Sequence, residues 1–410
     1  MGGGMRVCVV GLGHIGSALS MLIADAGHRV IGLDTDAELV KAIEHDQFTP
    51  REPGTEAPYR KACEEGRFTA TLDASVAVTD AEVVVIIVPV PVDSDHRPDL
   101  TNLERACAAI GPHLSRDSLV VVESTLPPGT MEGVVRAALE QASGLTAGRD
   151  FFLAHSPERV MAGTIVEQMR SYPKVIGALT ATGRQRAERF YTTFCPSVLA
   201  MPNLISAELG KVVEGVYRDV NIALANHLAR VCEDLGADFT AVHRAANSQP
   251  YCHLHRPSAG VGGLCIPVYP YFLPSRGQSD LVRACRAYNE IVPRFVAERT
   301  LELSGESATI LTLGLAFRAG IRDMRLSPSL EIITTLREAG RTVRVMDPNY
   351  TSGEIMSACG CASKPVGDFI LVLTAEDAFA NILIDNPDTP SLDCTGRFPQ
   401  ATYQLGRNIA

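Results

Sequence analysis

Two short glycine-rich stretches contain the residues that are best suited to chemistry. Gly11-Leu-Gly13-His14-Ile15-Gly16 lies near the start of the chain, and residues 260–263 lead into Cys265. Glycine allows a backbone to turn tightly and to approach a ligand closely. A cysteine thiolate is the strongest nucleophile among the ordinary side chains. The second stretch therefore predicts a nucleophile beside a ligand, although most cysteines are small packing residues.

The first stretch has the context of a dinucleotide site. It follows a strand-like run at residues 6–10, opens a helical pattern, and precedes a second strand-like run that ends in Asp34. In such a site the three glycines permit a tight turn, close approach of a pyrophosphate, and close packing of helix on strand. The helix N-terminus then binds the pyrophosphate. Asp34 can accept hydrogen bonds from ribose hydroxyls and would repel a 2′-phosphate, so the predicted cofactor is NAD. The predicted contacts are Gly11, Gly13, His14, Ile15, Gly16 and Asp34.

Composition narrows the possible partners. The 410 residues carry a net charge of −10, which leaves no basic stripe for a nucleic-acid backbone. The longest nearly uninterrupted apolar run, residues 83–92, is about half of the roughly 20 residues that a membrane-spanning helix needs. The eleven cysteines show no CxxC pair and no metal-ligand spacing. The start of the chain lacks the apolar core of a signal peptide. We expect a cytoplasmic protein without a metal, a nucleic-acid partner or a membrane partner.

Strand-like and helical patterns alternate in the first part of the chain. The predicted strands are residues 6–10, 29–33, 83–88, 119–122, 151–155 and 174–176. Strict alternation implies βαβ units and a parallel sheet covered by helices on both faces. We therefore predict an α/β, doubly wound, Rossmann-like NAD-binding domain at residues 1–200.

The rest of the chain predicts a helical middle domain and a second α/β domain. Apolar residues recur at intervals of three and four from about residue 206 to residue 238, and a second helix is predicted at 281–304. These helices give a central domain at residues 201–304. Strand and helix alternate again in a second Rossmann-like domain at residues 305–410. Its predicted elements are strands at 309–313, 342–346 and 369–373 and a helix at 327–339.

Seven further segments fit together in one order. They are Val88-Pro-Val-Pro-Val-Asp93, Glu123-Ser-Thr-Leu-Pro-Pro-Gly-Thr130, His155-Ser-Pro-Glu-Arg-Val160, Ala207-Glu-Leu-Gly-Lys211, Arg218-Asp-Val-Asn221, Gly260-Val-Gly-Gly-Leu-Cys265-Ile-Pro, and Gly314-Leu-Ala-Phe-Arg318 with Arg325-Leu-Ser-Pro328. Together they resemble the UDP-glucose/GDP-mannose dehydrogenase family across essentially the whole chain. The likeness is greatest to the branch that oxidises UDP-N-acetylhexosamines, of the UDP-N-acetylmannosamine type.

The resemblance implies an oxidoreductase that converts the C6 alcohol of a nucleotide sugar to a carboxylate with two NAD reductions. It assigns Cys265 to capture of the C6 aldehyde as a thiohemiacetal, whose oxidation gives a thioester that water hydrolyses. It assigns Lys211 to stabilising charge on the reacting oxygen and Glu158 to proton handling during thioester hydrolysis. The implied substrate contacts are Arg159, Val160, Lys211, Arg218, Gly262, Phe317 and Arg318. The implied cofactor contacts are Val88, Pro89, Ser124, Thr125 and Arg325. The last domain would bind UDP, and the long helix would form a homodimer.

Four positions depart from the family pattern. Gly215 replaces an asparagine one turn after Lys211, and Tyr269 replaces an aspartate four residues after the cysteine. Leu264 replaces a histidine, and Val90 replaces a threonine. The asparagine and the aspartate, together with the lysine, hold the catalytic water in that family. Loss of one oxyanion donor costs on the order of a hundred- to a thousandfold in rate. The replacements therefore imply altered chemistry.

We hypothesise a single two-electron oxidation that stops at an aldehyde, with Tyr269 and Lys211 as an acid/base pair. Packing beside other aromatic residues is an equally weighted role for Tyr269. Two further hypotheses stay open. One is an epimerase or dehydratase that retains NAD, and the other is a binding protein that has lost catalysis. The presence of Cys265 and Lys211 counts against the second, because a binding protein has no need of a thiol in that loop.

Overall fold

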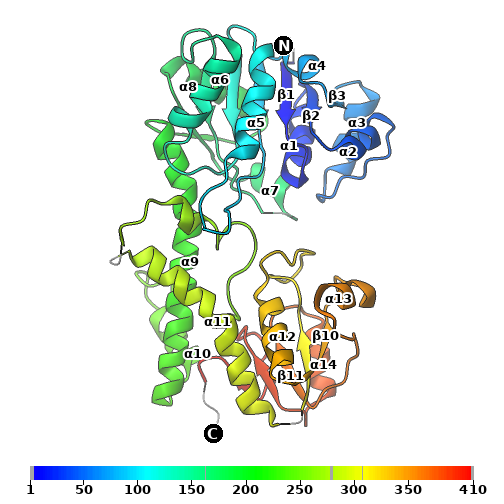
Figure 1. The fold of residues 1–410 in the computed structure, drawn as a ribbon, viewed down its shortest axis with the longest axis vertical. Helices are drawn as coiled ribbons and strands as arrows, with labels where there is room; N and C mark the ends of the chain where they lie inside the picture. The colour runs from blue at the N-terminus through cyan, green and yellow to red at the C-terminus, as the bar shows by residue number, and fades with distance from the viewer. Residues whose placement is uncertain (1–3, 162, 278–279, 307, 408–410) are drawn as a thin grey trace. The chain divides into compact units, whose positions relative to one another are not determined.

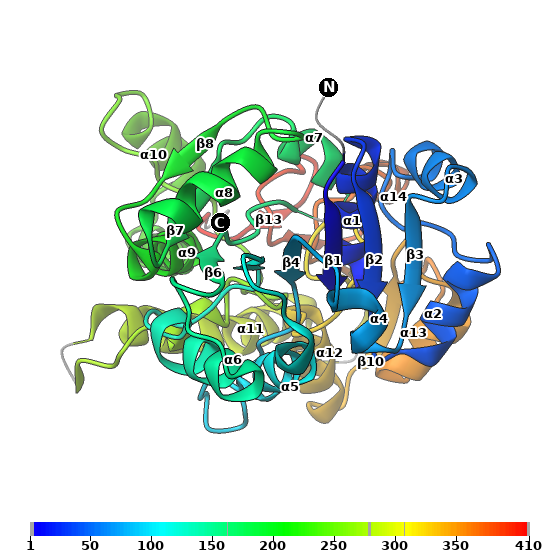
Figure 2. The same ribbon diagram turned by 90° about the horizontal axis from the view of Figure 1, so that it is seen from above.

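The computed structural model describes residues 4–161, 163–277, 280–306 and 308–407. Backbone contacts divide the chain into two compact units (Figures 1 and 2). The first unit comprises residues 1–213 with 271–273, and the second comprises residues 214–270 with 274–410.

The first unit is built on an eight-stranded sheet with the strand order β3-β2-β1-β4-β5-β6-β7-β8. The strands are β1 Arg6–Val10, β2 Arg29–Leu33, β3 Phe68–Thr71, β4 Val83–Ile86, β5 Leu119–Val122, β6 Phe152–His155, β7 Lys174–Ala178 and β8 Val198–Ala200. All neighbouring pairs are parallel except β6 and β7. The prediction of a purely parallel sheet was therefore wrong at this pair. In the described part of the connection, residues 156–161 and 163–173, the one helix is the short α7 Ile165–Met169, and the chain re-enters the sheet from the edge at which β6 ends.

Helices cover both faces of this sheet. They are α1 His14–Asp25, α2 Ala37–Glu44, α3 Glu56–Glu64, α4 Ala74–Val78, α5 Thr101–Ile110, η1 Gly111–His113, η2 Met131–Val135, α6 Arg136–Ser143, α7 and α8 Ala181–Tyr191. Alternate residues of β1 enter two separate apolar cores, because successive side chains in a strand point to opposite faces. Residues of α1, α3, α7 and α8 fill one core, and those of α4, α5 and α6 fill the other. The doubly wound fold predicted from the sequence is confirmed.

The second unit contains a five-stranded parallel sheet with the order β10-β9-β11-β12-β13. The strands are β9 Thr309–Leu313, β10 Thr342–Met346, β11 Phe369–Val372, β12 Ser391–Asp393 and β13 Tyr403–Gln404. The helices α12 Pro328–Glu338 and α13 Ser352–Cys359 pack on one face of this sheet, and α14 Phe379–Asp385 packs on the other. This arrangement is the second Rossmann-like sheet that the sequence predicts.

Long helices occupy the middle of the chain. They are α9 Leu204–Leu235 and α11 Leu281–Ser304, with the shorter α10 Phe239–Ala246 and η3 Tyr269–Phe272 between them. Helix α9 ends three residues before the predicted end because Gly236 takes a φ of +70°, a left-handed conformation that stops a helix. Helix α11 matches its predicted range, and the Asp280 side chain caps its first amides.

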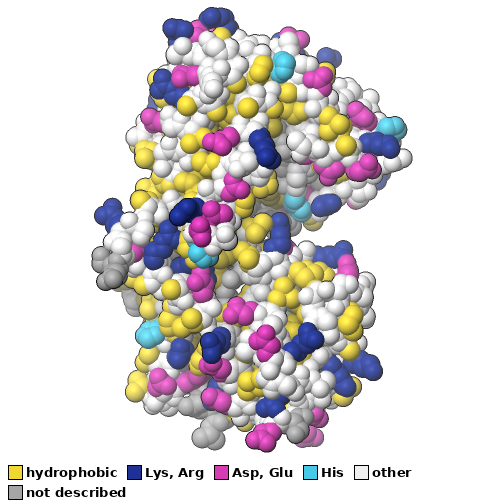
Figure 3. All heavy atoms as spheres, viewed as in Figure 1, with side chains coloured by type: hydrophobic (Ala, Val, Ile, Leu, Met, Phe, Trp, Pro, Cys, Tyr) yellow, Lys and Arg dark blue, Asp and Glu magenta, His cyan; other side chains and the backbone are white. Residues whose placement is uncertain are grey.

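Figure 3 shows acidic and basic side chains interspersed over the visible face. Across the described ranges, every helix is too short or too polar to span a lipid bilayer. In the same part of the chain, no three His, Cys, Asp or Glu side chains gather as metal ligands would.

Candidate active site

The three glycines of the first loop have different surroundings. Gly11 takes a φ of +97°, and a Cβ built on it would lie 2.3 Å from the Ile87 carbonyl oxygen. A Cβ on Gly16 would lie 1.9 Å from the Gly11 carbonyl oxygen. By contrast, a Cβ on Gly13 would meet none of the described atoms within 4 Å. The protein's own packing therefore requires the first and third glycines. The second leaves an open surface at the N-terminus of α1, as a bound pyrophosphate needs.

Asp34 lies at the end of β2 and is tied to the glycine loop. Its Oδ2 accepts a hydrogen bond of 2.5 Å from the Leu12 amide, and its Oδ1 accepts one of 3.0 Å from the Asp36 amide. The carboxylate is half-buried. The glycine loop and the acid thus lie together as the residues of an NAD site must, and Ile15 packs its side chain against the core.

The residues that follow β4 and β5 lie at the carboxyl edge of the sheet, where they can form a second part of the cofactor site. The Ser124 hydroxyl donates to the Val88 carbonyl over 2.7 Å and accepts from the Val88 amide over 2.8 Å. This pair of bonds ends β4 at Ile86, two residues before the predicted end. Pro89 and Thr125 come next in the sequence after Val88 and Ser124. Pro89 is exposed and Thr125 is half-buried. Ligands of open α/β sheets bind at this carboxyl edge of the strands.

Glu158 and Lys211 both belong to the first unit and interact electrostatically. Glu158 follows β6, and its carboxylate accepts a hydrogen bond from the Val160 amide. Burial raises the pKa of Glu158, and the positive charge of Lys211 opposes that shift. Arg159 donates to the Pro173 carbonyl over 3.3 Å. A carboxyl whose pKa is raised by burial suits proton transfer near neutral pH.

A buried ion pair, Lys174 with Glu123, is connected to the backbone of Glu158. Lys174 Nζ is 2.7 Å from Glu123 Oε2, and the Tyr191 hydroxyl donates to Glu123 Oε1 over 2.6 Å. The backbone carbonyl of Glu123 also accepts a hydrogen bond of 3.0 Å from the backbone amide of Glu158. The charges of Lys174 and Glu123 act on the pKa of Glu158 with opposite signs. Sequence reasoning missed this cluster because Glu123 and Lys174 are 51 residues apart.

Cys265 and Tyr269 stand one turn apart in the second unit. The Cys265 carbonyl accepts the Tyr269 amide over 3.0 Å, which closes a single helical turn, and the cysteine is exposed. Tyr269 is only 8% exposed. Its ring packs on Gly215 of α9: a Cβ at residue 215 would lie 2.4 Å from Tyr269 Cδ2. The two departures from the family pattern are therefore complementary in space.

The loop before Cys265 packs closely on two later segments. A Cβ on Gly262 would lie 2.5 Å from Phe317 Cβ, and one on Gly263 would lie 2.8 Å from Phe317 Cζ. The Gly263 amide also donates to the Arg325 carbonyl over 3.0 Å. These glycines are required because no side chain fits between the loop and Phe317.

Cationic side chains surround Cys265. Partial burial and the charge of Arg318 lower the pKa of Arg218, and Cys265 acts in the opposite direction. Burial and the charge of Arg218 also lower the pKa of His255, a neighbour that sequence reasoning missed. Hydrogen bonds from the Arg325 guanidinium reach both carboxylate oxygens of Asp323. Guanidinium groups donate in a planar fork that matches a diphosphate.

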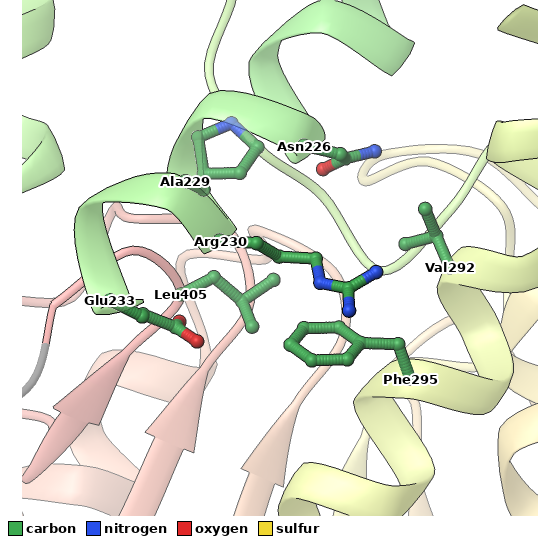
Figure 4. A pocket seen from close by; sticks show the side chains of 8 residues that line it. Asn226, Ala229, Arg230, Glu233, Val292, Phe295 and Leu405 are labelled. Atoms are coloured by element: carbon green, nitrogen blue, oxygen red, sulfur yellow. The ribbon is translucent and has the colours of Figure 1, made fainter. Parts of the chain in front are cut away.

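A small cavity in the second unit is lined by Asn226, Arg230, Phe295 and neighbouring side chains (Figure 4). Its volume is about 10 Å³, and the Arg230 guanidinium lies 4.3 Å from the Phe295 ring centre. Such a cavity has room for about one water molecule. It is therefore far too small for a sugar or a nucleotide.

Three family models of the UDP-glucose/GDP-mannose dehydrogenase family match the chain in succession. The NAD binding domain matches residues 5–195, the central domain matches residues 205–291, and the UDP binding domain matches residues 311–389.

Individual relatives agree with these matches. UDP-N-acetyl-D-mannosamine dehydrogenase of Pyrococcus horikoshii is 36% identical over 357 residues, which cover 85% of this chain and 84% of that protein. NDP-N-acetyl-D-galactosaminuronic acid dehydrogenase of Ralstonia solanacearum is 33% identical over 84% of this chain and 83% of that protein. The solved structure of UDP-D-ManNAc dehydrogenase from Pyrococcus horikoshii superimposes with a TM-score of 0.87 at 31% identity, over 99% of this chain and 100% of that one. The chain therefore belongs to the UDP-glucose/GDP-mannose dehydrogenase family, and its cofactor is NAD.

Proposed function

We propose that this protein oxidises the C6 hydroxyl of a UDP-N-acetylhexosamine with NAD and releases the product at the aldehyde stage. The relatives named for UDP-N-acetyl-D-mannosamine and NDP-N-acetyl-D-galactosaminuronic acid support this class of substrate. The guanidinium groups beside Cys265 supply donors for a sugar-linked diphosphate.

In the proposed reaction, NAD held by the glycine loop and Asp34 would supply the acceptor for the hydride that leaves C6. The hydroxyl proton passes to the phenolate oxygen of ionised Tyr269, which becomes a neutral phenol, and Lys211 stabilises the charge on the C6 oxygen. Glu158 then passes that proton to solvent, which restores the phenolate. Cys265 adds reversibly to the aldehyde carbon as a thiohemiacetal, which neither gains nor loses electrons. One sugar and one NAD thus give one aldehyde, one NADH and one proton.

The observation that carries the one-step proposal is the packing of Tyr269 on Gly215. The family's second oxidation ends with water attacking a thioester, and that water is held by an asparagine and an aspartate. Here the first position has no side chain and the second holds a ring in the space beside it. The chain therefore lacks both groups that would orient the hydrolytic water.

The test restores the family pair. We expect the purified wild-type protein to form one NADH per UDP-N-acetylmannosamine and an aldehyde, detected by mass spectrometry after hydrazone trapping. The double variant Gly215→Asn with Tyr269→Asp should form two NADH per sugar and a carboxylate. Two NADH per sugar from the wild type would contradict the one-step proposal. NAD that copurifies without net NADH formation would favour a non-oxidising enzyme.

The single variant Gly215→Asn is the matched control. Its new Cβ would collide with the Tyr269 ring, and overpacking of this kind costs about 1–3 kcal/mol. We expect a lower melting temperature than in the double variant, where the ring is removed, and no carboxylate product.

We also propose a homodimer formed along α9. Ile205, Leu209, Val213 and Tyr217 recur every four residues on this helix, and each is 40–49% exposed. Side chains four residues apart lie on one helix face. An exposed apolar row of this length is typical of a helix that is covered by another chain.

We propose one role for each of the three domains predicted from the sequence. Residues 1–200 would bind NAD, residues 201–304 would carry the cysteine loop and the dimer helix, and residues 305–410 would bind the UDP moiety. We propose that the enzyme works in the cytoplasm, where reduced cysteines such as Cys265 persist.

A further inference from the structure

Glu52 is a buried carboxylate that joins two loops of the first unit. It is 3% exposed. Its Oε2 lies 2.8 Å from His14 Nε2 and accepts the Gly163 amide over 2.9 Å, while Oε1 accepts the Ile165 amide over 2.7 Å. Three partners at this burial offset the cost of removing a charge from water.

The partners of Glu52 belong to the cofactor side and to the substrate side of the proposed site. His14 is the first residue of α1 and follows Gly13, where the open surface for a pyrophosphate lies. Gly163 and Ile165 end the loop that begins after β6 and carries Glu158 and its neighbours.

The segments 156–161 and 163–165 that follow β6 are each held by hydrogen bonds, at Ser156 and at Gly163 and Ile165. In the first segment, the Ser156 amide donates to the Val122 carbonyl over 3.0 Å, and the Ser156 hydroxyl donates to the Val175 carbonyl over 2.7 Å. In the second segment, Glu52 holds two amides. The backbone of Glu52 is itself held, because its carbonyl accepts the Thr55 hydroxyl over 2.6 Å. The Glu52 carboxylate therefore links the His14 side chain to one end of the loop that follows β6.

We propose that Glu52 is a positioning residue that couples occupancy of the dinucleotide loop to the arrangement of the sugar-facing loop. The inference rests on the proposed function, in which Glu158, Arg159 and Val160 face the sugar. Coupling between two ligands is reciprocal, so the sugar nucleotide must change the affinity for NADH by the factor with which NADH changes the affinity for the sugar nucleotide.

The experiment measures the dissociation constant of NADH by its fluorescence, with and without a saturating UDP-sugar. NADH cannot be oxidised by the sugar alcohol, so the ternary complex is stable. UDP-N-acetylmannosamine, UDP-N-acetylglucosamine and UDP-glucose are each used, and UDP without a sugar is the ligand control. We expect at least one UDP-sugar to change the wild-type dissociation constant about fivefold or more. UDP alone should leave it unchanged.

Three variants separate coupling from stability. His14→Ala removes the bond between Glu52 and the glycine loop and leaves both amide bonds of Glu52 intact, whereas Glu52→Gln also disturbs the two amide bonds. In both variants we expect the dissociation constant of NADH to differ less than twofold between measurements with and without the UDP-sugar. Asp150→Asn is the matched control, because Asp150 is a buried carboxylate bound by Arg116 and by the Thr146 amide before β6, at the other end of that strand. It should melt earlier yet keep the wild-type ratio.

The outcomes distinguish this inference from the proposed function. Unchanged coupling in His14→Ala, which leaves the backbone bonds of Glu52 intact, would overturn the inference even if Glu52→Gln fails to fold. A wild-type ratio of one with every UDP-sugar would also overturn it. Failure of the wild type to form NADH from NAD and any UDP-sugar would instead contradict the proposed function, and the ratio would still be measurable.

Discussion

The Tyr269 ring occupies the space that a side chain at residue 215 would need, and its hydroxyl stands in the loop one turn after Cys265. The two departures could be read from the sequence, but their contact could not, because 54 positions separate them in the chain. The same limit hid Glu52, because the partners of its carboxylate lie 38 and more positions away. By contrast, the glycine loop and Asp34 were predictable, since their spacing is local.

Tyr269→Phe separates the phenol from the ring. If the phenolate accepts the hydroxyl proton, its loss should lower kcat by about a hundredfold or more and remove one limb of the pH–rate profile. The melting temperature should stay unchanged because the ring still packs on Gly215. Tyr271→Phe is the control, since that ring stacks on His96 instead, at 4.3 Å. An unchanged kcat and pH profile in Tyr269→Phe would assign Tyr269 to packing alone.

At the scale of elements, long patterned segments were predictable and short ones were not. The periodicity of α11 gave its range, and the four-residue strands β4, β5, β6 and β11 were predicted, whereas β8, β12 and β13 have only two or three residues and were missed, as was β3. Strands this short carry too few positions for an alternating pattern. The direction of β7 was also not predictable, because it depends on the path of an irregular connection.

The start of α11 depends on one carboxylate. A hydrogen bond from the Arg276 amide lowers the pKa of Asp280, and hydrogen bonds from the Arg283 and Val282 amides lower it further. We expect Asp280→Ala to lower the free energy of unfolding by about 1 kcal/mol at pH 7.

The sign of the pH dependence follows from the lowered pKa. The ionised cap stabilises the folded state above the unfolded pKa of about 4, and that contribution is lost as the pH falls through the folded value. Urea unfolding of wild type and Asp280→Ala from pH 7 to pH 2.5 should give converging curves. A difference that is constant with pH would rule out the ionised cap.

At the scale of the whole molecule, the apolar row on α9 predicts association. Leu224, 45% exposed, lies on the same helix, and Leu224→Glu would bury a charge in the proposed interface. We expect a loss of about 2 kcal/mol of dimer stability, roughly thirtyfold in Kd, by sedimentation velocity. Val76→Glu, on the exposed side of α4, should sediment as the wild type does. A wild-type protein that sediments as a single chain at micromolar concentration would refute the dimer.

Helix α9 runs without interruption through the boundary between the two compact units, which falls between Val213 and Glu214. Most domain boundaries fall in flexible linkers, where insertions and deletions are tolerated. Here an inserted residue would rotate all later helix positions by about 100° and advance them by about 1.5 Å. An insertion between Lys211 and Gly215 would therefore change the face of α9 on which each later residue of the helix lies.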